Sequence, residues 1–319
     1  MNERVRRGSS LLRRVAVLCI LTLMSSPPPG AATSAAAGSP AGVRSGPVTV
    51  IHAEGDTGYA RAVVDLAAAA HQRIGEDLGL EHSIEVAILL LTANSPSATR
   101  EEWARRLPSW MAGAALPARQ LIVVRVRPGQ TPRSLEPVLA HELTHVILQA
   151  DYPRHDDWPL WFQEGLAMRE SRTEGLREYL TLSAAALFDR MLPLESLSLR
   201  FPDRESEARL AYAQSASFLG FLDARAGRGR FAVLMRELRE RDFAEAFHGA
   251  YGLGTGAAES LWLRWVSRRY AWVPAVTSET AFWLLITVLF FVAIAARRRR
   301  SRIMRERWEE EERRQGDDS

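Results

Sequence analysis

Two histidines four residues apart constrain this chain more than any other feature of its sequence. His141 and His145 enclose Glu142 in the run His-Glu-Leu-Thr-His. On an α-helix, residues i and i+4 lie on one face about one turn apart, so both imidazoles could reach one metal ion. Glu142 is turned about 100° from His141 and can face an attacking water instead of binding the metal. Without a third ligand, a metal-free pair of helix histidines is an equally good interpretation.

The surrounding sequence supplies the helix that this spacing requires. An apolar pattern with a helical period runs over residues 135–149, and Leu139, Leu143 and Ile147 can bury part of that helix. Ser134 is expected to cap it, and Pro137 is tolerated in its first turn.

A third ligand follows at a specific interval. Eighteen residues separate His145 from Glu164, which lies in the run Trp-Phe-Gln-Glu-Gly-Leu-Ala at 161–167. This combination resembles the gluzincin metallopeptidases, the peptidase MA-like group, with aminopeptidase N and its relatives as the nearest pattern. The resemblance implies that His141, His145 and Glu164 hold one Zn²⁺ ion per chain and that Glu142 is the general base. The apolar neighbours of Glu164 indicate a buried wall rather than a solvated helix face.

A weaker resemblance concerns Tyr212, in the run Tyr-Ala-Gln-Ser. Family members place a tyrosine in a comparable motif, where its hydroxyl stabilises the oxyanion, so the resemblance implies a catalytic role for Tyr212; a core aromatic is the alternative. The chain departs from the aminopeptidases because no Gly-x-Met-Glu-Asn segment precedes His141. It departs from the thermolysin pattern because residue 168 is Met. Endopeptidase action is therefore favoured, with the strand at 120–126 expected as an edge strand on which substrate could pair.

The pattern along the body predicts an α+β, zincin-like fold in which a small N-terminal mixed β-sheet lobe with helices precedes a mainly helical lobe. Strands are expected at 48–51, 84–91 and 120–126. Helices are expected at 58–78, 98–107, 135–149, 160–170, 176–186, 205–226, 231–239 and 256–270.

The two ends of the chain predict export and membrane attachment. Residues 1–37 read as a signal peptide with its cleavage region, because five arginines precede a short apolar run and small residues. Residues 38–47 are expected to be a flexible linker and 48–272 the extracytoplasmic domain. The apolar segment 280–296 is a candidate transmembrane helix. The arginines that open the charged tail 297–319 place that side in the cytoplasm.

Composition excludes several other classes. The single cysteine, Cys19, allows neither a disulfide within the chain nor a cysteine-built metal site. The net charge of +3 comes from the two ends, so the body lacks the basic surface of a nucleic-acid binder. The sequence thus predicts a membrane-anchored zinc metallopeptidase acting on peptides or proteins. The alternative is a catalytically silent, peptidase-like binding or scaffold module; the sequence does not indicate an oligomeric state.

Overall fold

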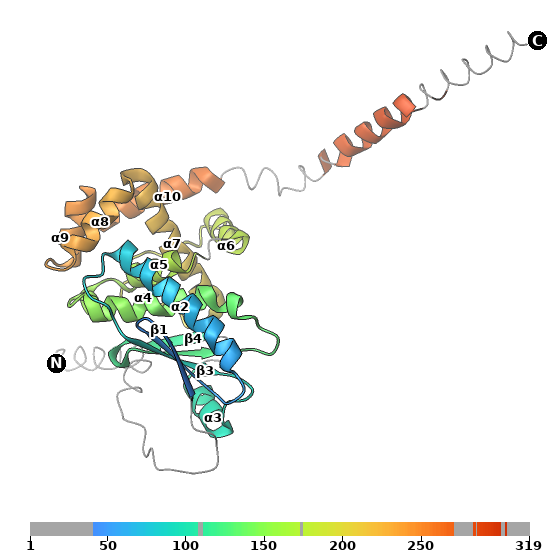
Figure 1. Cartoon of the computed structure of the whole chain (residues 1–319). Helices are drawn as coiled ribbons and strands as arrows, with labels where there is room; N and C mark the ends of the chain where they lie inside the picture. The colour runs from blue at the N-terminus through green and yellow to red at the C-terminus, as the bar shows by residue number, and fades with distance from the viewer. Residues whose placement is uncertain are drawn as a thin grey trace, which may run out of the picture.

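The computed structural model shows one folded body followed by a C-terminal helical segment (Figure 1). It describes residues 41–107, 111–172, 175–270, 283–284, 286–300 and 304. The predicted signal peptide at 1–37 lies outside the described residues, as does most of the predicted tail.

Within the described residues, a five-stranded mixed sheet has the strand order β1-β2-β3-β5-β4. The pairs β2–β3 and β3–β5 are parallel, whereas the outer pairs β1–β2 and β4–β5 are antiparallel. The strands are β1 Ala41–Ser45, β2 Val48–His52, β3 Val86–Leu91, β4 Gly113–Leu116 and β5 Leu121–Arg125. The three predicted strands are confirmed as β2, β3 and β5.

Two strands that the sequence did not predict form the edges of this sheet. The linker predicted at 38–47 is wrong for residues 41–45, which form β1 and pair with β2. Gly46 makes the turn between them with a φ of 55°, a conformation that glycine adopts without strain. β1 and β4 consist mainly of small residues, and backbone hydrogen bonds to one neighbour order them. Because both strands contain few large apolar side chains, the sequence pattern did not predict them.

Helices cover both faces of the sheet (Figure 1). α2, Thr57–Leu78, and α4, Glu136–Asp151, share one hydrophobic core with the sheet. α3, Ser97–Arg106, covers the opposite face, where Trp103 and Leu107 are buried against the sheet. All three helices were predicted, with ends that differ by at most about two residues from those observed.

The second half of the body is helical. Its helices are α5 Leu160–Ser171, α6 Leu176–Leu187, α7 Glu205–Ala226, α8 Arg228–Glu237, α9 Phe243–Tyr251 and α10 Thr255–Tyr270. Only α9 was not predicted, although its buried residues Phe243, Ala246, Phe247 and Ala250 recur at the spacing of one helix face. The prediction of an α+β chain with a small mixed sheet and a mainly helical second lobe is confirmed.

The C-terminal apolar segment stands apart from this body in Figure 1. Residues 286–300 are helical, and many of their apolar side chains are exposed, among them those of Val288, Phe290 and Phe291. Among the described residues, no helix is both long enough and apolar enough to span a membrane. The predicted membrane helix at 280–296 includes residues 280–282 and 285, which are not described, so it stays a prediction.

Candidate metal centre

The histidine pair lies in α4, which begins slightly later than expected. Ser134 does not cap the helix; its hydroxyl donates to the carbonyl oxygen of Thr131 at 2.7 Å, within a 3₁₀ turn. α4 starts at Glu136, and Pro137 occupies its first turn, where a missing N–H breaks no helical hydrogen bond. The predicted helical context of the motif is therefore present.

His141 and His145 lie one turn apart on α4, as the spacing predicted. Their ring centroids are 5.0 Å apart, with the ring planes inclined by 73°. The two Nε2 atoms are 3.3 Å apart. Two ring nitrogens at this separation face a common point, where neutral imidazoles can offer both lone pairs to one cation.

Glu164 on α5 completes the group. Its Oε2 atom lies 3.5 Å from Nε2 of His141 and 3.5 Å from Nε2 of His145. This oxygen is buried and has no hydrogen-bond partner among the described residues. Ligand atoms of the three residues all lie within 4.8 Å of one another, so the group could hold a metal ion. Two imidazoles and a carboxylate match the ligands of catalytic zinc sites.

The charges around the group favour a cation. Burial opposes ionisation of Glu164, but the charge of His145 and the contacts with both imidazoles hold the pKa of this carboxyl well below its usual range. Burial likewise favours the neutral imidazole of His145, yet the carboxylates of Glu164 and Glu142 raise its pKa. An ionised carboxylate thus lies beside two titratable rings. Elsewhere in the described chain, no three His, Cys, Asp or Glu side chains bring their ligand atoms within 4.8 Å of one another.

Gly165 sets the distance between α5 and α7. A Cβ atom at this position would lie 3.0 Å from the carbonyl oxygen of Ser215 and 3.0 Å from Cδ1 of Leu219. The backbone of α7 could not yield without also moving Tyr212, three residues before Ser215. Glycine beside Glu164 is therefore required by the close approach of the two helices.

Tyr212 reaches the metal group from α7. Its ring centroid lies 6.2 Å from that of His141, and its side chain lines the same cavity as Glu142. The negative charge of Glu164 raises the pKa of Tyr212, and burial and Glu142 raise it further. The hydroxyl therefore keeps its proton and can donate a hydrogen bond. The structure brings this candidate to the site that the resemblance implied.

A cavity of about 250 Å³ adjoins the group between β4, α4, α5 and α7. Its lining residues are Met111, Ala112, Gly113, Pro137, Val138, His141, Glu142, Met168, Ser171 and Tyr212. A Cβ atom on Gly113 would lie 2.8 Å from Cγ1 of Val138 and 3.4 Å from Cγ of Glu142, so glycine lets β4 approach α4. The expectation that the strand at 120–126 forms the edge is wrong, because β5 lies inside the sheet and β4 forms that edge.

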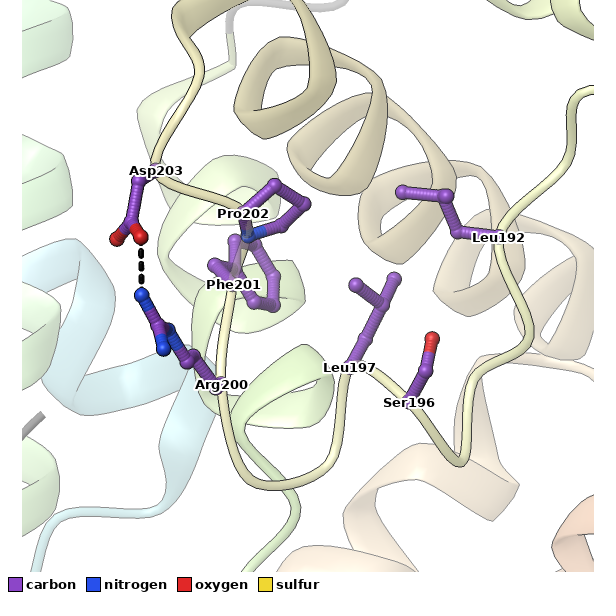
Figure 2. A pocket seen from close by; sticks show the side chains of 7 residues that line it. All are labelled: Leu192, Ser196, Leu197, Arg200, Phe201, Pro202 and Asp203. Carbon is purple, nitrogen blue, oxygen red and sulfur yellow. Dashed lines mark hydrogen bonds and ion pairs between the residues drawn. The ribbon is translucent and has the colours of Figure 1, made fainter. Parts of the chain in front are cut away.

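The loop between α6 and α7 forms an apolar pocket of about 270 Å³ next to Tyr212. Figure 2 shows its lining side chains, those of Leu192, Ser196, Leu197, Arg200, Phe201, Pro202 and Asp203. The ring of Phe201 packs against that of Tyr212, with centroids 5.0 Å apart. The backbone N–H of Trp161 donates to the carbonyl oxygen of Leu197 at 3.1 Å, which ties the loop to the start of α5. No motif in the sequence pointed to this loop.

Comparison with known families agrees with this geometry. The sequence model of the peptidase MA superfamily matches residues 69–268, more than half of the chain. The chain belongs to the peptidase MA superfamily. The match contains the histidine pair, Glu164 and Tyr212. A search of the curated proteins found no match to this chain.

Membership of the peptidase MA superfamily indicates a peptidase, since members of this superfamily are typically metallopeptidases. The resemblance drawn from the sequence is thus confirmed at the level of the superfamily. In this peptidase MA chain, His141, His145 and Glu164 form the group that could hold a metal ion.

Proposed function

We propose that this peptidase MA protein is a zinc-dependent peptidase that hydrolyses internal peptide bonds. The observation that carries the proposal is the convergence of His141, His145 and Glu164 next to a cavity that Glu142 lines. The buried, unpaired Oε2 of Glu164 supports the fit of a cation to these residues. When bound, a zinc ion would polarise the scissile carbonyl and lower the pKa of a water molecule.

Glu142 is placed to move protons. It follows His141 on α4 and lines the cavity without belonging to the metal group. Its carboxylate takes a proton from the attacking water as the C–O bond forms. It then gives that proton to the nitrogen of the leaving amine as the C–N bond breaks. The side chain ends each cycle as it began.

Tyr212 stabilises the developing charge from α7, where its side chain lines the same cavity. As the carbonyl carbon becomes tetrahedral, its oxygen gains negative charge and accepts a hydrogen bond from the Tyr212 hydroxyl. The raised pKa of Tyr212 supports this role because the group has to arrive protonated.

The walls of the cavity support endopeptidase action. β4 is an edge strand beside Glu142, and an extended peptide can add to such an edge through backbone hydrogen bonds. Among the described residues that line the cavity, Glu142 is the only carboxylate. A free N-terminal amine therefore finds no second acid there to hold it.

Membrane attachment is part of the same proposal. The arginine-rich start followed by an apolar run supports export. The apolar segment 280–296, followed directly by arginines 297–300, supports a single-pass anchor with the tail in the cytoplasm. The peptidase domain then lies outside the cytoplasm.

The test uses the full chain, purified in detergent, and the variant Glu142→Gln. We expect the variant to keep the zinc content of the wild type while its turnover falls by about 100-fold to 10,000-fold. Internally quenched peptides with both ends blocked report endopeptidase activity, and aminoacyl-coumarin amides report aminopeptidase activity. Metal content is measured by mass spectrometry on the same samples.

Glu136→Gln is the matched control, since Glu136 is an exposed glutamate on the same helix, and it should leave turnover unchanged. Undiminished hydrolysis by Glu142→Gln would contradict the role of Glu142. A zinc-loaded, folded wild type that cleaves neither substrate class would instead identify a silent peptidase-like module.

A further inference from the structure

A row of apolar side chains on α6 and on the residue that caps its C-terminus, Phe188, faces solvent. Leu180, Ala184, Leu187 and Phe188 recur at the spacing of one helix face, and all four are exposed. The exposed fractions are 55% for Leu180, 39% for Leu187 and 64% for Phe188. The other side of α6 is buried through Leu182. The helix thus has two apolar faces, and the described part of the domain covers one of them. We call the exposed face the α6 stripe.

The α6 stripe lies close to the point where the chain leaves the domain. α10 ends at Tyr270, whose ring packs edge-on against that of Tyr179 on α6, with centroids 5.0 Å apart. Thr280, the first residue of the candidate membrane segment, follows Tyr270 by ten residues. Ten residues span at most about 36 Å when fully extended. A bilayer entered at residue 280 is therefore within reach of α6.

Basic side chains lie at the α6 stripe and at the point where the chain leaves the domain. The guanidinium group of Arg190 lies 5.7 Å from the ring centroid of Phe188. Arg268 and Arg269 are exposed in the last turn of α10, which contacts α6 through Tyr270. With the exposed Asp189 counted, these residues carry an excess of positive charge. Arginine lays its aliphatic stem on apolar surface and keeps its charge in water, an arrangement suited to the headgroup level of a bilayer.

We propose that the α6 stripe rests on the surface of the membrane to which the C-terminal segment attaches the protein. This inference rests on the proposed membrane attachment. An amphipathic helix of this kind lies in the plane of the interface with its apolar face toward the acyl chains. The tether raises the effective concentration of the domain at that surface, so a weak contact suffices. The contact would hold the peptidase domain in one orientation on the bilayer.

The experiment exploits the single cysteine of the chain. In a Cys19→Ser background, the full chain is reconstituted in vesicles of phosphatidylcholine and phosphatidylglycerol, with and without doxyl-labelled lipid. Three single-cysteine variants carry the same environment-sensitive fluorophore. Ala184→Cys reports on the α6 stripe and Val288→Cys on the candidate membrane segment. Ala104→Cys is the matched control, because Ala104 is an exposed alanine on α3, at the opposite end of the domain from α6 (Figure 1).

We expect doxyl lipid to quench the fluorophore at 184 and at 288 but not at 104. Quenching at 288, with 184 behaving like 104, would overturn the α6 contact and leave the anchor in place. Quenching at 184 alone would support the contact and reject the anchor. No quenching at any position would reject both. A disulfide between two Ala184→Cys chains that forms equally well in detergent would show a second copy on this face and overturn the proposal.

Discussion

Two poorly exposed carboxylates on α5, Glu164 and Glu170, meet opposite environments. The side chain of Glu170 is 2% exposed, and its Oε2 lies 2.7 Å from Nη1 of Arg73. A second guanidinium, that of Arg169, lies 3.5 Å from its other carboxylate oxygen. Glu164, less than two turns earlier on the helix, has two imidazoles at 3.5 Å. Its Oε2 has no hydrogen-bond partner in the described part of the chain.

The difference between these environments separates a structural group from a functional one. Arginine keeps its proton inside proteins, so Glu170 has permanent cationic partners. Burial raises the pKa of Glu170, and the charges of Arg169 and Arg73 oppose that rise. An imidazole can lose its proton and offer a lone pair instead. The environment of Glu164 is therefore completed when a cation binds, whereas that of Glu170 is complete without one.

The largest loss of metal binding and activity is expected for Glu164→Gln. Loss of a direct ligand should weaken metal binding by more than the roughly 10-fold to 100-fold that outer partners of a metal contribute. Activity should be lost with the metal, while the apo protein stays folded. Metal content and circular dichroism of the purified chain measure this. Glu170→Gln, the same exchange at the other site, should retain the metal; equal metal loss in both variants would refute the distinction between them.

Arg73→Ala addresses the other carboxylate. Removing Arg73 leaves the buried Glu170 with only the more distant guanidinium of Arg169, at 3.5 Å, and should cost about 3 kcal/mol of stability, the low end for a broken buried ion pair. Chemical denaturation of the metal-free protein gives this free energy of unfolding. Arg61→Ala, at an exposed position on the same helix, should change stability by less than about 0.5 kcal/mol. A stable Arg73→Ala protein that has lost its metal would reverse the two assignments.

Tyr212→Phe tests whether the Tyr212 hydroxyl, which the nearby charge of Glu164 keeps protonated, takes part in catalysis. The variant keeps the ring against His141 and Phe201 but removes the donor. We expect kcat to fall by about 100-fold to 1,000-fold, as on loss of one oxyanion donor, with metal content and stability unchanged. Tyr179→Phe, whose ring packs against Tyr270 and does not line the cavity, is the control. An unchanged kcat in Tyr212→Phe would leave Tyr212 as a core aromatic.

The smallest loss of stability and activity is expected for Gly165→Ala. The added methyl group would meet the backbone of α7 at Ser215, and overpacking of this kind costs about 1–3 kcal/mol. Because α7 also carries Tyr212, activity should fall with stability. Gly249→Ala provides the comparison, since no atom lies within 4 Å of a Cβ atom there, and alanine at that exposed position of α9 should raise stability slightly. Equal stability of the two variants would show that α5 and α7 have room to separate.

Most of the fold follows from patterns that the sequence displays directly. β2, β3 and β5 were predicted because each is a short apolar run, with turn residues after β3 and β5. Most helices were predicted because their apolar residues recur with the period of a helix. β1 and β4 were missed because small residues at a sheet edge carry no such period. α9 was missed although its buried residues recur at helical spacing over its nine residues. Its aromatic side chains contact α5, with Phe243 and Phe162 ring centroids 4.9 Å apart, a contact distant in sequence that no local pattern records.

The candidate site also has parts that the sequence predicted and parts that it did not. The sequence indicated His141, His145 and Glu164 because the spacing of the first two requires a helix and the motif around the third resembles a known family. The pocket formed by the loop around Phe201 could not be predicted, since a loop without periodicity gives no sign of what it packs against. The strand beside the cavity was misassigned for a related reason: edge and interior positions depend on strand order, which local sequence does not encode.

The sequence by itself determined which side chains are available to bind a metal and to move protons, because helical spacing is a local property of the backbone. Only the tertiary structure decided that Glu164, on a different helix, meets the two histidines while Glu170 meets arginines. Packing between helices fixes which partner each carboxylate receives. The packing of α5 against α4 and α2 gives Glu164 and Glu170 those partners. Gly165, which lets α5 lie against α7, and Gly113, which lets β4 lie against α4, help to set the shape of the cavity.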